Sequence, residues 1–326
     1  MVDYKGLLVN TGAYKIFESD FIKGKLSHAY LLLHSDGLAL QEFLKIFSAL
    51  IVCENKTACL GCRKCNLVLS GVHADVLSYP KDKKGLVVAD VNSIIEESVI
   101  KPIESNKKIF LIFGAENMNA TSQNKLLKTL EEPPENVVIL MGATSDSPLL
   151  PTIKSRVKRL EIGAFSQESL YSAIQDGSFD EESLKNAINC SNGTVSDAIF
   201  NYESRDMSSV YSFAVETINS MQSSRDVLTF VSSFFAKKMD VDIFLSALAV
   251  IFRDMLVALE GKENLVKNKD VYNKVKDAKG YTRGALINAI EKINQAENRK
   301  KFNANGQMLV EWLFFQILEG KYKWQK

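Results

Sequence analysis

The sequence predicts an α/β domain with a parallel sheet, followed by two regions that are entirely helical. Over the first 162 residues, short apolar runs alternate with helical patterns. Two of these runs, at 109–113 and 137–141, contain no polar residue, which is typical of central strands covered on both faces. After residue 164 the sequence carries no strand pattern. Such alternation favours parallel strands joined by right-handed crossovers.

The individual elements follow from their local patterns. We expect buried strands at 29–33, 75–79, 109–113 and 137–141. An amphipathic helix follows the first strand at 38–52, and a second occupies 90–100 with Asp90 as its N-cap. A third helix ends at the pair Pro133-Pro134, because proline cannot continue a helix.

A chain of 326 residues exceeds what one hydrophobic core usually organises, and we expect three domains. Their predicted bounds are 1–162, 163–206 and 207–326. The middle domain has short helical patterns broken at Gly177 and Gly193, with Asp180 as an N-cap. In the third domain, helices at 243–259 and 308–318 are apolar around most of their circumference, so they are expected to be buried against other helices.

The charge balance excludes a polyanion-binding protein by composition, because 40 Lys+Arg face 39 Asp+Glu, a net charge of +1. From residue 207 onward, 18 basic against 13 acidic residues give +5, leaving −4 for the rest. An asymmetry this small is more typical of a solvated surface than of a nucleic-acid footprint. The N-terminus has no basic segment followed by an apolar run, and no apolar stretch reaches membrane length. We therefore expect a cytoplasmic protein with no membrane partner.

Four of the five cysteines fall within a module at 53–65. They are Cys53, Cys59, Cys62 and Cys65. Four thiolates with C-x2-C spacing are typical of a closed tetrahedral zinc site, which is structural because no coordination position stays open. His73 is the alternative fourth ligand, but a histidine this distant is more often an ordinary surface or core residue. Cys190 is expected to be a small core side chain.

The segment 118–134, MNATSQNKLLKTLEEPP, resembles the MNxxxQNxLLKxLEEPP motif of bacterial clamp-loader ATPase-like subunits, which are AAA+ proteins. Ser155-Arg156 follows where that family carries an arginine finger, with Val157 in place of a cysteine. The resemblance implies a RecA-like AAA+ domain with an inserted zinc loop, a helical lid and an all-helical collar used for oligomerisation. Gamma/tau and delta-prime subunits carry four zinc-binding cysteines at this place, although the first gap is shorter here.

The family's ATP site lacks several parts in this chain. Between the strand at 29–33 and the helix that follows, a phosphate-binding loop needs glycines and a lysine. The residues present are His34, Ser35, Asp36 and Gly37. Asp36 is expected to repel a triphosphate. Glu116 is a single carboxylate where the family has an acidic pair, and Thr194 to Asp197 replace the lid arginine. Thr144, at the sensor-1 position, is expected only to pack or cap. We predict that this chain does not hydrolyse ATP.

Taken together, the resemblance implies a delta-prime-type stator in the DNA polymerase III clamp loader. Arg156, with Ser155, would act in trans on the ATP of a neighbouring gamma/tau subunit. The implied partners are gamma/tau and delta subunits, the sliding clamp and primer-template DNA, the last two through the complex. Three alternatives stay open: Arg156 as a surface arginine paired with a carboxylate, an active gamma/tau-type ATPase, and a stand-alone zinc-containing DNA-binding protein.

Overall fold

The computed structural model describes residues 2–81, 86–175, 177, 179–189, 191–203, 207–301 and 305–324. Residues 204–206, which lie at the predicted boundary between the second and third domains, are outside the described residues. Cys190 is outside them as well. The chain divides into two compact units, each described separately below. Unit 1 comprises Met1–Ser178 and Gly193–Ser196, and unit 2 comprises Phe179–Asn192 and Asp197–Lys326. The division into three domains stays a prediction.

Unit 1 contains a parallel sheet, as the sequence predicted, with five strands where four were expected. Its strands are β1 (Ala29–Leu33), β2 (Val76–Tyr79), β3 (Lys108–Phe113), β4 (Val137–Ala143) and β5 (Lys158–Glu161). Their order across the sheet is β2-β3-β4-β1-β5. The two strands without polar residues in their predicted cores, β3 and β4, lie next to each other in the interior of the sheet. Every residue of β4 is buried.

The sequence analysis missed β5. This strand has the sequence KRLE, and only Leu160 among its four residues is buried. It pairs with β1 alone, so it forms the edge of the sheet. An edge strand with charged side chains resists pairing with other chains, but it lacks the apolar run by which a buried strand is recognised.

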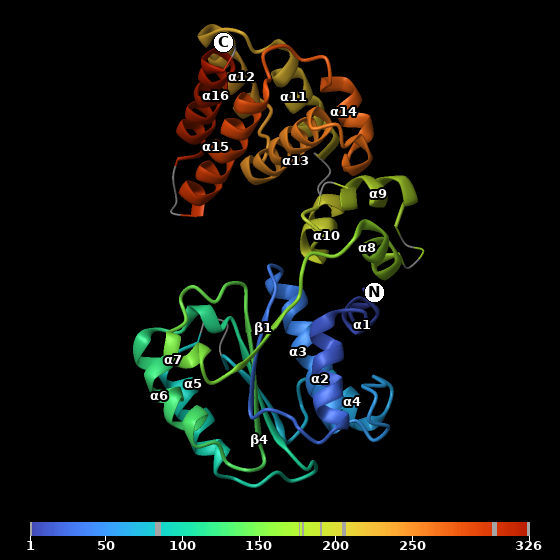
Figure 1. Ribbon diagram of the computed structural model, residues 1–326, viewed down its shortest axis with the longest axis vertical. Coiled ribbons are helices and arrows are strands. Elements are labelled where there is room, and N and C mark those ends of the chain that lie inside the picture. Colours follow the sequence, from blue (N-terminus) through green and yellow to red (C-terminus); the bar gives the residue numbers. More distant parts are fainter. Residues whose placement is uncertain are drawn as a thin grey trace. The chain divides into compact units, whose positions relative to one another are not determined.

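Helices cover both faces of this sheet (Figure 1). The first group is α1 (Tyr4–Val9), α2 (Gly12–Ile22), α3 (Gly37–Val52) and α4 (Arg63–Leu69). The second group is α5 (Val88–Ser98), α6 (Ala120–Glu131) and α7 (Pro151–Lys154), and α8 (Gln167–Ile174) follows the sheet. Figure 1 shows α2 and α3 on one face and α5 and α6 on the other. Val91 and Ile94 of α5 and Leu126 and Leu130 of α6 are buried against the strands, and each such side chain stabilises the fold by about 1.5–3 kcal/mol.

The predicted start of α5 was wrong. The helix begins at Val88, with Val87 as the cap residue, so Asp90 lies in the first turn and is not the N-cap. Its carboxylate reaches back to accept the Val87 N–H at 3.0 Å and also accepts the Lys81 N–H at 3.2 Å. An acidic group can satisfy free amides from the third helical position as well as from the cap, so one aspartate did not fix the boundary.

Unit 2 is helical throughout its described residues. Its helices are α9 (Glu181–Asn189), α11 (Met207–Ser220), α12 (Ser224–Ala236), α13 (Val241–Leu259), α14 (Lys269–Val275), α15 (Arg283–Lys301) and α16 (Gly306–Lys323). The helix α10 (Val195–Glu203) begins in unit 1 and continues into unit 2. Asp180 accepts the Ser183 N–H at 2.8 Å, which confirms it as an N-cap.

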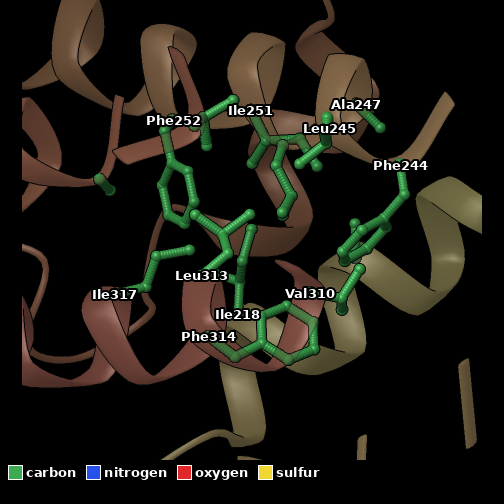
Figure 2. Close-up of a cluster of buried hydrophobic side chains, with 14 of the residues drawn as sticks. Ile218, Phe244, Leu245, Ala247, Ile251, Phe252, Val310, Leu313, Phe314 and Ile317 are labelled. Atoms are coloured by element: carbon green, nitrogen blue, oxygen red, sulfur yellow. The ribbon is translucent and has the colours of Figure 1, made fainter. Parts of the chain in front are cut away.

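The two helices predicted to be apolar all round, α13 and α16, contribute many of the buried side chains in the core of unit 2. Figure 2 shows Phe252 and Ile251 of α13 facing Leu313 and Ile317 of α16, and Phe244 next to Val310. Phe244 and Phe314 meet edge to face with ring centroids 5.6 Å apart, an arrangement that aromatic pairs favour. Burial of these helices is confirmed, except that Leu259 and Met308 at their ends are 56% and 72% exposed.

Candidate functional site

The turn between β1 and α3 lies where a nucleotide phosphate would bind in an ATPase of the resembled family. It consists of His34, Ser35 and Asp36, and Gly37 is the first residue of α3. Asp36 caps α3, and its Oδ1 accepts the N–H groups of Leu38 at 3.1 Å and Ala39 at 3.0 Å. Free amides at a helix N-terminus are a general binding place for anions. In this chain, the anion at the N-terminus of α3 is the carboxylate of Asp36.

A second segment reaches the same carboxylate. Ser196, at the start of α10, donates its N–H to Asp36 Oδ2 at 2.8 Å and its hydroxyl to Oδ1 at 2.6 Å. Asp36 is therefore only 4% exposed. Burial acts to raise the pKa of Asp36, but the hydrogen bonds from Ser196 and Ala39 outweigh it and hold the pKa below its ordinary value. The carboxylate is thus charged and satisfied by four hydrogen bonds.

His34 is 3% exposed and packs against the rings of Phe43 and Phe165, with centroid distances of 5.6 and 5.3 Å. Its Nδ1 lies 2.9 Å from the carbonyl oxygen of Ile162, and since a carbonyl only accepts, Nδ1 carries the proton. The buried Nε2 has no hydrogen-bond partner within the described residues. Burial lowers the pKa of His34, which keeps the ring neutral near pH 7.

Glu116 and Thr144 come together at the ends of β3 and β4. Glu116 lies in the short helix η1 (Ala115–Asn117), and its Oε1 accepts the N–H of Thr144 at 3.1 Å and the hydroxyl at 2.6 Å. A β-carbon on Gly37 would lie 3.6 Å from Thr144 Cγ2, so this pair is next to the β1–α3 turn. Thr144 therefore engages the single carboxylate of the degenerate site.

Arg156 follows α7 at some remove from the turn. It forms an ion pair with Glu131 at the end of α6, with Nη2 and Oε1 2.6 Å apart. Nη1 donates to the Thr152 carbonyl at 3.1 Å and to Ser155 Oγ at 3.2 Å. The Arg156 side chain is still 35% exposed. Within the described residues, the hydrogen bonds and ion pair of Arg156 do not include any residue of the β1–α3 turn.

The four cysteines of the module are brought together by the loop between α3 and α4. Their Sγ atoms all lie within 4.8 Å of one another. Cys59 Sγ is 3.6 Å from Cys53 Sγ and 4.0 Å from Cys65 Sγ. A tetrahedral zinc with bonds of about 2.3 Å separates its sulfurs by about 3.8 Å, so the spacing fits such an ion. His73 is not part of this cluster.

The backbone of this loop points amide groups at the sulfurs. The N–H groups of Cys59 and Cys62 lie 3.5 Å from Cys53 Sγ and 3.4 Å from Cys59 Sγ, respectively. Lys56, Ala58 and Leu60 have left-handed φ angles of 54°, 47° and 56°, which bend the chain around the cluster. Burial acts to raise the pKa of the Cys53 thiol, but backbone hydrogen bonds outweigh it and lower the pKa to about 6, which favours the thiolate that a metal needs.

Comparison with known proteins assigns the chain to a family. The family model described as "DNA polymerase III, delta subunit" matches residues 9–166. The delta-prime subunit of Bacillus subtilis DNA polymerase III is 25% identical over 314 residues, which cover 94% of this chain and 95% of that protein. The chain belongs to the DNA polymerase III delta-prime subunits.

Other relatives match shorter parts of this delta-prime chain. The delta-prime subunit of Pseudomonas aeruginosa is 35% identical over 135 residues, 40% of this chain and 41% of that one. The tau subunit of Bacillus subtilis is 26% identical over 159 residues, 48% of this chain and 28% of the relative. A solved gamma subunit-related protein of Thermotoga maritima shares 17% identity at a TM-score of 0.48, over 94% of this chain and 99% of its own.

The delta-prime chain has a five-stranded parallel α/β core with a four-cysteine insertion, followed by an all-helical region. In the described residues, no helix is both long and apolar enough to cross a membrane. The sequence analysis missed the partners of its site residues. It included Ser196 only within the run from Thr194 to Asp197, and Glu131 only within the motif at 118–134. The acidic pair at the end of that motif was the available signal for a carboxylate partner.

Proposed function

We propose that this delta-prime chain is a non-hydrolysing stator of the bacterial clamp loader and donates Arg156 to the ATP of a neighbouring gamma/tau subunit. It assembles with gamma/tau and delta subunits through its helical C-terminal region, as a collar. Through that complex it contributes to placing the sliding clamp on primer-template DNA.

One observation supports this proposal: the Asp36 carboxylate occupies the N-terminus of α3, while the Arg156 side chain remains 35% exposed. Asp36 accepts four hydrogen bonds at the helix N-terminus that an ATPase keeps for nucleotide. A guanidinium delivered from a neighbour stabilises charge on the phosphoryl oxygens in the transition state. In other nucleotide hydrolases such a finger contributes about 10³–10⁵ in rate.

The test uses the complex reconstituted from this chain, delta and gamma/tau subunits. Arg156→Ala is expected to leave assembly intact and to lower DNA-stimulated ATP turnover. Arg159→Ala is the matched control, because Arg159 lies nearby, is 54% exposed and pairs with Asp146 and Glu161. Equal turnover in the two variants contradicts the finger role. ATP hydrolysis by the purified chain alone contradicts the stator role and favours a gamma/tau-type ATPase.

We also propose that the four cysteines hold a structural zinc ion. They would bind it as thiolates, and the ion would supply no chemistry to the ATPase reaction. Cys53 follows the last residue of α3 and Cys65 lies in α4. The metal would therefore tie the end of one helix to the next and fix the loop between them.

A further inference from the structure

We infer that Glu131 is a positioning residue for Arg156, holding the guanidinium ready for a neighbour's triphosphate; this rests on the proposed function. The ion pair of 2.6 Å is the contact of the Arg156 side chain that comes from outside its own segment. The other two acceptors, Thr152 O and Ser155 Oγ, belong to α7 and its cap.

Hydrogen bonds of one buried side chain connect the helices that carry the two residues. Gln123 of α6 is 2% exposed and accepts the Leu150 N–H at 2.7 Å, one residue before α7 begins. The same side chain donates to the carbonyls of Met118 at 2.9 Å and Pro148 at 3.1 Å. These bonds connect α6 to the start of α7 and so help to place Glu131 next to Arg156. A group that is already ordered loses less side-chain entropy when it reaches its target.

The position of Glu131 at the C-terminus of a helix is electrostatically unfavourable for a carboxylate, and a nearby cation offsets this. Glu131 is the last residue of α6, close to the negative end of the helix dipole. The Arg156 guanidinium offsets that charge and also caps the end of α7 through the Thr152 carbonyl.

The contact leaves the arginine free to act. A guanidinium has five N–H groups, and three are used by Thr152, Ser155 and Glu131, so two remain. These are Nε–H and one N–H of Nη2, which have no partner within the described residues. Two N–H groups suffice for a bidentate contact with a phosphate. Glu131 therefore orients the side chain through one N–H group and leaves two others open to a phosphate.

The experiment measures the Arg156-dependent part of ATP turnover, defined as the difference between wild-type and Arg156→Ala complexes at saturating ATP and DNA. Glu131→Ala is expected to lower this part about two- to fivefold, the rate equivalent of one exposed ion pair. The ATP concentration at half-maximal rate should stay unchanged. Glu131→Gln, which keeps an acceptor oxygen, should lose less, and assembly is checked by gel filtration.

Glu132→Ala is the matched control. Its side chain is the exposed neighbour and forms no ion pair or hydrogen bond within the part of the chain that the structure describes. In the Arg156→Ala background, Glu131→Ala should have no further effect, because it acts through Arg156. The inference fails if Glu131→Ala matches the control, raises turnover, or lowers it equally without Arg156. If Arg156→Ala itself has no effect, the proposed function fails first.

Discussion

Asp36 and Ser196 are joined by two hydrogen bonds, of 2.6 and 2.8 Å, although 160 positions separate them in sequence. Together with the amides of α3, they form a closed polar cluster inside unit 1. A nucleotide phosphate at this place would have to displace a charged carboxylate that already has four donors. This relationship gives the loop between β1 and α3 a structural role.

Replacing Asp36 should therefore destabilise unit 1. Asp36→Ala removes a helix cap, worth about 0.5–2 kcal/mol, and leaves buried donors unpaired, at about 1–3 kcal/mol. We expect the free energy of unfolding to fall by about 2–4 kcal/mol in urea titrations, and by less in Asp36→Asn, which keeps one acceptor oxygen. An unchanged unfolding midpoint in Asp36→Ala would show that the cluster adds no stability.

The same carboxylate should make stability depend on acid pH. Because the pKa of Asp36 in the folded chain lies below its ordinary value of 3.8, its stabilising charge is fully present above 3.8. The contribution is lost as pH falls through the lowered folded pKa. The difference in unfolding free energy between wild type and Asp36→Asn should thus be constant from pH 7 to 5 and shrink towards pH 3. A difference that grows in acid would have the wrong sign.

The buried His34 should make the free energy of unfolding depend on pH near neutrality as well. Burial lowers its pKa from the ordinary 6.5, so the folded chain disfavours the proton that the unfolded chain accepts. Its contribution is complete above pH 6.5 and is lost as pH falls below that value, by at most about 1.4 kcal/mol per pH unit. His34→Asn should flatten the decline between pH 6.5 and 5 in thermal unfolding. Part of the decline should persist, because burial also lowers the pKa of His73.

Sequence patterns predicted the elements whose burial is nearly complete and missed those that depend on distant partners. The strands β1, β3 and β4 follow from their apolar runs, and α13 from its apolar circumference. By contrast, β5 is charged because it lies at the sheet edge, where only one side chain needs burial.

The site shows the same limit. A missing phosphate-binding lysine was visible in the sequence, but the pairing of Asp36 with Ser196 was not. The pair is set by how the chain returns from the sheet to α10, which no local pattern encodes. The pairing of Arg156 with Glu131 likewise depends on the packing of α6 against α7.

The close contact between β4 and α3 predicts a steric effect at Gly142. A β-carbon there would lie 2.8 Å from Leu44 Cδ1 and 3.0 Å from Leu40 Cγ, both on α3. Gly142→Ala should lower the free energy of unfolding by about 1–3 kcal/mol, as overpacking does. Gly163→Ala is the control, because its β-carbon would meet nothing within 4 Å. Equal unfolding midpoints for the two variants would contradict the tight packing.

The cysteine cluster predicts about one zinc ion per chain. Cys59 lies between two other sulfurs at 3.6 and 4.0 Å, so Cys59→Ser should abolish tight binding. Because the metal would tie α3 to α4, its loss should lower the free energy of unfolding by about 3 kcal/mol or more. Elemental analysis and urea titration check both effects, with Cys190→Ser as a control that keeps the cluster intact. Wild-type protein that is fully folded and contains no metal, or Cys59→Ser protein with wild-type zinc content, would contradict the zinc proposal.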